Sequence, residues 1–119
     1  MSTAQTVQHP PEERRRAPRR QPAQGTTCHL ATGAGQELGM GLVWNISSTG
    51  VSMLVGKRLE PGAQLQGELL TADARTKLDL SLRVAHLFPL RTGDYFLGGQ
   101  FERPLTAQEL RPFVGEVAS

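Results

Sequence analysis

Residues 78–84 read Leu-Asp-Leu-Ser-Leu-Arg-Val, with an apolar side chain at every second position. Because successive side chains of a β-strand point to opposite faces of the sheet, this period of two predicts a strand with one buried and one solvent-facing side. A solvated face is typical of antiparallel sheets, since parallel sheets are usually covered on both faces. The stretch therefore indicates an antiparallel β-fold.

The sequence pattern stays typical of β-strands from Gly25 onward. Short apolar or alternating runs are separated by clusters of Gly, Pro, Asp, Ser and Thr, the residues that turns favour. The predicted strands cover residues 26–32, 40–45, 50–55, 65–71, 78–88 and 95–102. Six short strands of this kind usually close into a barrel or a sandwich. The sequence thus predicts an all-β domain.

The last segment changes to a helical pattern. Thr106 and Glu109 have the spacing of a capping box, in which each side chain bonds the other residue's backbone N–H. Apolar residues then recur at helical spacing. Pro112 interrupts the pattern because it lacks a backbone N–H and crowds the preceding turn. We expect a helix over residues 105–118, either kinked at Pro112 or split into two short helices.

The length of 119 residues suits a single domain. We expect a disordered lead over residues 1–11, followed by one domain over 12–119. Within that domain the sequence predicts a flexible arginine-rich arm over 12–24, a β-barrel over 25–104 and the C-terminal helix. No apolar run is long enough to span a membrane, and no secretory signal is visible. With a single cysteine, these features indicate a cytoplasmic protein.

The net charge is distributed unevenly along the chain. Residues 1–24 hold five arginines and two glutamates, a net charge of +3, whereas residues 25–119 hold eight basic and nine acidic residues, a net charge of −1. The excess positive charge therefore belongs to the arm. This asymmetry indicates that the arm meets an anionic partner.

The arm reads Glu-Arg-Arg-Arg-Ala-Pro-Arg-Arg over residues 13–20, and it contains Arg15-x-x-x-Arg19. Guanidinium groups are planar and permanently charged, and they bind phosphates and guanine edges in two-point fashion or stack on bases. Pro18 disfavours a helix here. In an extended chain, residues four apart lie roughly 13 Å from each other. That separation suits two sides of a dinucleotide.

A second motif, Asn45-Ile-Ser47-Ser-Thr-Gly50, lies between two predicted strands. Asn45 offers a donor and an acceptor, and Ser47 offers a hydroxyl for a phosphate oxygen. Gly50 permits a backbone conformation with positive φ and lets a ligand approach closely. Taken alone, the motif has a second interpretation as a plain hairpin turn.

Together the two motifs resemble the PilZ family, whose signature is R-x-x-x-R followed downstream by D/N-x-S-x-x-G. The resemblance extends over about residues 12–115. It includes the strand Gly-Val-Ser-Met-Leu at 50–54, the Pro61-Gly62 turn, the Gly98-x-x-Phe101 strand and the Leu105-Thr106 helix start.

The resemblance implies a six-stranded antiparallel β-barrel with a C-terminal helix that binds the second messenger cyclic di-GMP. Carried over by position, Arg15 and Arg19 would bind guanine edges and phosphates, while Asn45 and Ser47 would hold the nucleotide from the barrel side. Gly50 would shape the turn.

Two positions refine this expectation. Aspartate is commoner in the family where this chain has Asn45, which has one acceptor oxygen where aspartate has two. A basic residue at the position of Arg14 favours a bound pair of nucleotides over a single one. Both the stoichiometry and the affinity stay open.

The remaining chemistry-bearing residues form no recognisable catalytic or metal site. We expect no enzyme activity and no cofactor beyond the ligand cyclic di-GMP, with an unidentified effector protein downstream. Met40 and Trp44 are expected in the core, Cys28 and His29 within a strand, and His86 in a structural role. Two alternatives are a PilZ-like adaptor that binds only protein and a nucleic-acid-binding module that uses the basic arm; the acidic body, poor in aromatic residues, argues against the second.

Overall fold

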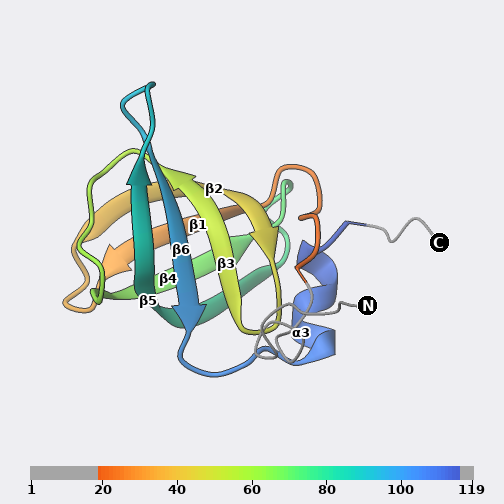
Figure 1. Ribbon diagram of the computed structural model, residues 1–119. Helices are drawn as coiled ribbons and strands as arrows, with labels where there is room; N and C mark the ends of the chain where they lie inside the picture. Colours follow the sequence, from red (N-terminus) through yellow and green to blue (C-terminus); the bar gives the residue numbers. More distant parts are fainter. Residues whose placement is uncertain (1–18, 116–119) are drawn as a thin grey trace, which may run out of the picture.

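The computed structural model describes residues 19–115. They form a closed antiparallel barrel in which the strand order is β1-β2-β3-β6-β5-β4 (Figure 1). The strands are β1 Thr27–Thr32, β2 Glu37–Ile46, β3 Gly50–Val55, β4 Gln64–Leu70, β5 Lys77–Pro89 and β6 Tyr95–Phe101. All six predicted strands are confirmed; the strand over residues 50–55 has the predicted bounds, and no boundary is shifted by more than three residues.

The barrel core follows from the alternation seen in β5. Leu80, Leu82 and Val84 point inward and are 9%, 0% and 1% exposed, whereas Asp79 and Arg83 lie on the outside. The other strands supply the same kind of inward side chain, and together these residues fill the barrel: Cys28, Leu30, Ile46, Val51, Met53, Val55, Leu65, Leu69, Leu97 and Phe101. Burial of this apolar surface is the main stabilising contribution.

The expected core positions of Met40 and Trp44 are wrong. Met40 is 48% exposed and Trp44 is 61% exposed, both on the outer face of β2. Between them, Gly41 is buried, and an added Cβ there would collide with Sδ of Met53 from the neighbouring strand. Because Met53 already fills this part of the interior, β2 has a glycine at the position that faces it.

The C-terminal helix is much shorter than the expected range of 105–118. Helix α3 covers Ala107–Leu110, and a 3₁₀ turn, η1, covers Arg111–Phe113. Pro112 cannot continue the α-helical hydrogen bonding, and Val114 is already extended. The split into two short helical segments is therefore the form observed. The part of the expected helix beyond residue 115 lies outside the described residues.

The capping box predicted at the start of this helix is confirmed. Thr106 N–H donates to Oε1 of Glu109 over 3.0 Å, and Glu109 N–H donates to Oγ1 of Thr106 over 3.0 Å. Leu110 and Phe113, 8% and 1% exposed, pack against the barrel core. Within residues 19–115 no helix is long and apolar enough to cross a membrane.

Residues 19–23 form a strap between the barrel and the C-terminal segment. Arg20 exchanges two backbone hydrogen bonds with Ile46 of β2, at 2.8 and 3.1 Å. On the other side, Ala23 N–H donates to Phe113 O, and Pro22 pairs with Val114. Arg20, which lies within the arm that the sequence predicts to be flexible, is thus hydrogen-bonded to the barrel in this structure. Residues 1–18, with the lead and most of the arm, lie outside the described residues.

Candidate functional site

Arg19 brings the two sequence motifs together. Its Nη1 donates to Oδ1 of Asn45 over 2.8 Å and to Oγ of Ser52 over 3.1 Å. The pairing of Arg20 with Ile46 sets this geometry, because it fixes the backbone next to Arg19 against the end of β2. The second arginine of the R-x-x-x-R motif therefore lies on the asparagine of the downstream motif.

Ser52 is a site residue that the sequence reasoning missed. In β3 it alternates with the inward residues Val51 and Met53, so its hydroxyl points to the outer face. It is only 5% exposed, and the Arg19 guanidinium is hydrogen-bonded to its hydroxyl. The strand alternation gave a signal for its outward orientation, but only the folded strap shows that it meets an arginine.

The polar row, as we name it, consists of Asn45, Ser52, Gly98 and His86. These residues lie opposite one another on β2, β3, β6 and β5, as successive pairs in the strand register. A β-bulge between Val43 and Asn45 turns both Trp44 and Asn45 toward solvent. The row thus crosses four strands on one face, starting beneath the Arg19 guanidinium.

Ser47 serves the turn in this structure. It is 3% exposed, and its Oγ accepts hydrogen bonds from the backbone N–H groups of Thr49 and Gly50, each over 3.2 Å. Its hydroxyl also lies 3.2 Å from the hydroxyl of Thr49. The side chain therefore holds the turn that follows Asn45 and the end of β2, and in the described contacts its oxygen is engaged within that turn.

Gly50 does not adopt the positive φ that a glycine permits. The glycines with positive φ among the described residues are Gly25, Gly35, Gly39, Gly62 and Gly93. Gly50 is needed for a different reason, because an added Cβ would lie 2.6 Å from the carbonyl oxygen of Gly99 on β6. The residue allows β3 and β6 to approach closely next to the site.

Arg14 and Arg15 lie outside the described residues. Their predicted contacts with a nucleotide stay predictions.

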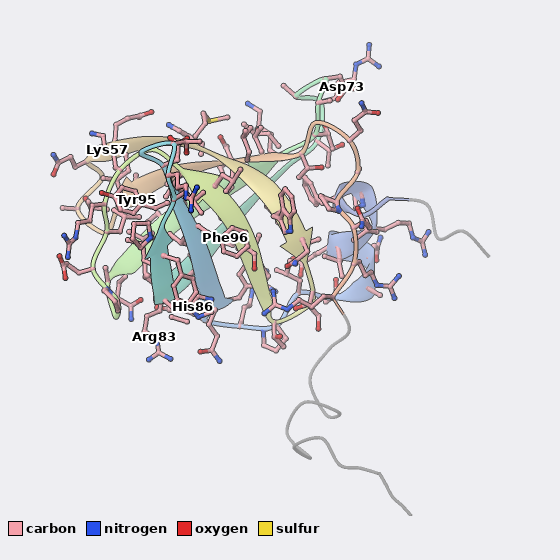
Figure 2. All side chains as sticks on the ribbon, turned by 45° about the horizontal axis from the view of Figure 1, so that its top comes forward. Lys57, Asp73, Arg83, His86, Tyr95 and Phe96 are labelled. Carbon is pink, nitrogen blue, oxygen red and sulfur yellow. The ribbon has the colours of Figure 1, made fainter. Side chains whose placement is uncertain are left out.

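An apolar row borders the polar row one step along the strands. It consists of Leu42, Leu54, Phe96 and Phe88, which are paired in register across β2, β3, β6 and β5. Phe88 is 55% exposed. Figure 2 shows Phe96 and His86 on the same side of the barrel, on neighbouring strands. Aromatic and aliphatic side chains therefore adjoin the cation and amide of the site.

Two aromatic contacts organise this surface. Trp44 meets Phe96 edge-on, with ring centroids 6.3 Å apart and an angle of 82° between the rings. His86 lies beside Phe88, with centroids 5.2 Å apart and a tilt of 36°. Such pairs stabilise each other modestly and restrict the ring orientations.

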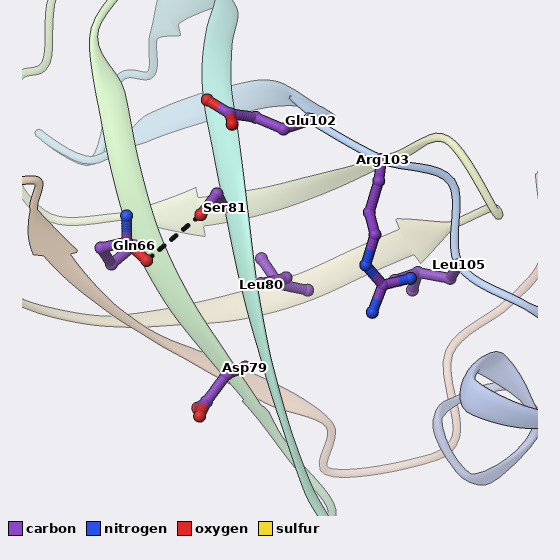
Figure 3. Close-up of a pocket in the computed structure, with 7 residues that line it drawn as sticks. All are labelled: Gln66, Asp79, Leu80, Ser81, Glu102, Arg103 and Leu105. Atoms are coloured by element: carbon purple, nitrogen blue, oxygen red, sulfur yellow. Dashed lines mark hydrogen bonds between the residues drawn. The ribbon is translucent and has the colours of Figure 1, made fainter.

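A separate cavity of about 440 Å³ lies where β4 and β5 meet the 102–105 segment (Figure 3). Asp79 and Glu102 contribute carboxylates, and Arg103 is bound to both carboxylate oxygens of Glu109, at 2.9 and 2.8 Å. The Arg103 guanidinium and the capping hydrogen bond lower the pKa of Glu109 to about 2. With its cation already paired, this cavity is poorly suited to an anionic ligand.

Cys28 is in β1, as the sequence predicts, and it is fully buried. Burial raises the pKa of its thiol to about 12. The thiol therefore stays protonated and unreactive near neutral pH.

Among the described residues, the arrangement around Arg19 offers a guanidinium, an amide, a hydroxyl, an imidazole and exposed aromatic rings on one face. Guanidinium groups recognise phosphates and guanine edges, and aromatic rings recognise the faces of bases. The chemistry of this face suits an anionic ligand that also has planar bases.

Three solved structures have the same fold. The apo form of MrkH from K. pneumonia matches with a TM-score of 0.61 and 19% identity, covering 82% of this chain and 48% of that one. The complex of MrkH with c-di-GMP matches with a TM-score of 0.64 and 19% identity, covering 89% and 50%. The inhibitor of motility MotI/DgrA from Bacillus subtilis matches with a TM-score of 0.55 and 16% identity, covering 87% and 52%.

The chain therefore spans about half the length of these similar structures. A search of curated proteins finds no match. The profile of the PilZ domain family matches residues 13–117, which includes the arm, the whole barrel and the C-terminal segment. With the closed barrel, and with Arg19 resting on Asn45, the chain belongs to the PilZ domain family.

Proposed function

We propose that the protein is a cyclic di-GMP receptor that acts by binding and not by catalysis. The observation that carries the proposal is the contact of Arg19 with Asn45 and Ser52, at 2.8 and 3.1 Å. It joins the arginine-rich motif to the downstream motif at one surface point. Family membership and the ligand named for the MrkH complex support the same ligand class.

The Arg19 guanidinium has capacity left for a ligand. Both of its described hydrogen bonds come from Nη1, whereas a guanidinium has three further N–H donors on Nη2 and Nε. Those donors can take a phosphate oxygen or the O6/N7 edge of guanine. We propose that Arg14 and Arg15 add further donors from the preceding part of the arm.

Asn45 acquires a more definite role in this proposal. Its Oδ1 already accepts from Arg19, so its amide N–H₂ is the group left for the ligand. An N–H₂ donor matches the O6 and N7 acceptors of guanine, while an aspartate at this position would accept from N1–H and N2–H. This difference explains how asparagine can serve at a position where aspartate is commoner.

The strap gives the bound ligand a route to a partner protein. Arg20 is paired with β2, and Pro22 is paired with Val114 in the C-terminal segment. A ligand that binds Arg19 therefore contacts the strap, residues 19–23. The backbone of this strap is paired both with the barrel and with the C-terminal segment. We propose that the shape of this end changes for a downstream effector.

Calorimetric titration with cyclic di-GMP tests the proposal. Loss of charge-assisted hydrogen bonds from Arg19→Ala is expected to weaken binding about 10- to 100-fold. Arg91→Ala is the matched control, because Arg91 is exposed in the β5–β6 loop, away from Asn45. The titration also gives the stoichiometry, for which Arg14 favours two nucleotides. Equal affinity of both variants and the wild type contradicts the site.

A protein-binding adaptor without a ligand is the second candidate. The exposed Met40, Leu42 and Trp44 on β2 favour it, because exposed apolar patches often mark interaction surfaces. The same titration separates the two candidates, since an adaptor of this kind gives no heat with cyclic di-GMP. A gel shift with random DNA and RNA at physiological salt tests the nucleic-acid alternative.

A further inference from the structure

His86 is held in an unusual position on the outer face of β5. It is exposed and lies opposite Gly98 of β6 in the strand register. An added Cβ at Gly98 would collide with three atoms of the imidazole, namely Nε2, Cε1 and Cδ2. Because three ring atoms approach this one point, the ring lies across the space that a side chain at position 98 would occupy.

This placement brings the imidazole next to the Arg19 site. Ser52, to which Arg19 is bonded, is the register partner of Gly98 on the other side. Neighbouring strands are about 4.8 Å apart, so a ring above Gly98 lies about one strand spacing from the strand of Ser52. Since Gly98 has no side chain, nothing from β6 separates the guanidinium from the imidazole in this row.

The neighbouring rings define the surroundings of His86. Phe88 supports it from one side at a centroid distance of 5.2 Å, and Phe96 with Trp44 forms the next aromatic pair. Figure 2 places His86 and Phe96 on the same face, with Arg83 beyond His86 along β5. Arg83 donates to Gln100 over 3.1 Å. On this outer face of the barrel, the imidazole ring of His86 thus lies between the guanidinium groups of Arg19 and Arg83.

The two kinds of group match the two parts of a nucleotide. A guanidinium attracts phosphate, and an exposed ring stacks on a base. The polar row crosses four strands, so its width is about 14 Å, and a cyclic dinucleotide can lie along it with its charged backbone near Arg19.

We infer that a guanine base of cyclic di-GMP stacks on the imidazole of His86. This inference rests on the proposed function and extends it, because it adds a base-binding residue on β5 to the two motifs on the arm and the β2–β3 loop. It also replaces the expected structural role of His86. The ring packs beside Phe88, and the residue is exposed, so that a base can approach it from solvent.

Calorimetry with cyclic di-GMP on the full chain tests the inference. His86→Ala is expected to weaken binding about 5- to 100-fold, the range measured for single base–aromatic stacks. His86→Phe keeps a ring and is expected to bind within about 3-fold of the wild type. His86→Gln keeps hydrogen bonding but no ring, and it is expected to behave like His86→Ala.

His29→Ala is the matched control. His29 is also on the outer face, but it is on β1, which pairs with β2 and β4 and not with β6. Its substitution is expected to leave the affinity unchanged. NMR supplies an independent readout, because a stacked purine shifts the carbon-bound ring protons of His86 upfield while those of His29 stay in place.

The outcomes separate this inference from the proposed function. If Arg19→Ala weakens binding and His86→Ala does not, the stacking role is overturned and the receptor function stands. If His86→Gln retains full affinity, His86 acts through hydrogen bonds and stacking is again overturned. If the wild type does not bind cyclic di-GMP, both proposals fail.

Discussion

The two sides of the barrel share one core but present opposite chemistry. On one side, the polar row runs beneath the Arg19 guanidinium, and aromatic side chains border it. On the other side, His29, Glu68 and Asp79 lie in one row across β1, β4 and β5, with Glu37 bound to His29. The second row has three carboxylates around it, so it repels the anion that the first row attracts.

Strand β5 belongs to both sides. Its first half carries Asp79 on the acidic side, and its last half carries His86 and Phe88 on the aromatic side. A bulge between Val84 and His86 changes the register where one side passes into the other. The alternation of a strand therefore secures the core, while the partner strands decide what its outer side chains contact.

The largest expected effect separates core from surface. Met53→Ala removes a fully buried side chain and is expected to lower the free energy of unfolding by about 2–5 kcal/mol. Trp44→Ala removes a larger side chain that is 61% exposed, and it is expected to change the free energy of unfolding by less than about 1 kcal/mol. Urea denaturation of both variants checks this; a greater loss for Trp44→Ala would contradict its place on the surface.

A second test concerns the close approach of β3 and β6 on the aromatic side. Gly50→Ala places a Cβ 2.6 Å from the Gly99 carbonyl oxygen and is expected to destabilise the fold by about 1–3 kcal/mol. The control is Gly33→Ala in the β1–β2 turn, where an added Cβ meets nothing within 4 Å. Urea denaturation should show a loss only for Gly50→Ala. Equal stability of the two variants would contradict the tight packing.

The two serines of the site should differ in what they affect. Ser47→Ala leaves the N–H groups of Thr49 and Gly50 without their acceptor and is expected to cost about 1–2 kcal/mol of stability. Ser52→Ala removes one partner of Arg19 and is expected to weaken cyclic di-GMP binding more than it changes the melting temperature. Thermal denaturation and calorimetry on both variants make the comparison. Unchanged stability in Ser47→Ala would show that its hydroxyl is not needed for the turn.

The smallest expected effect is on the side away from Arg19 and depends on pH. Arg103 lowers the folded-state pKa of Glu109 to about 2, from its ordinary value of 4.5. A lowered pKa means that the ionised form stabilises the fold above the unfolded pKa, and that this contribution is lost as the pH falls toward 2. The melting temperature of the wild type should therefore exceed that of Glu109→Gln at pH 6, and the difference should narrow between pH 4.5 and 2.

The matched control for this pH test is Glu60→Gln. Glu60 is exposed and lies 4.0 Å from Arg58, and exposed pairs of this kind contribute little. A difference for Glu109→Gln that stays constant with pH would contradict the role of its charge.

The sequence by itself determined the β-fold, the six strands, the capping box and the two motifs. Each of these depends on neighbours in the chain: alternation at period two, turn residues, and reciprocal hydrogen bonds over three residues. The predicted helix is too long because the apolar spacing continues past Pro112, while the chain there is extended and pairs with Pro22. That pairing is a long-range contact without a local signal.

Only the tertiary structure decided how the motifs meet and what surrounds them. The strap sets Arg19 on Asn45 and Ser52, the bulge in the pairing of β2 with β3 turns Trp44 outward, and Gly98 makes room for His86. Each of these depends on the register between strands far apart in sequence. A sequence pattern specifies which way a side chain points from its own strand, whereas the neighbouring strands specify what it contacts there.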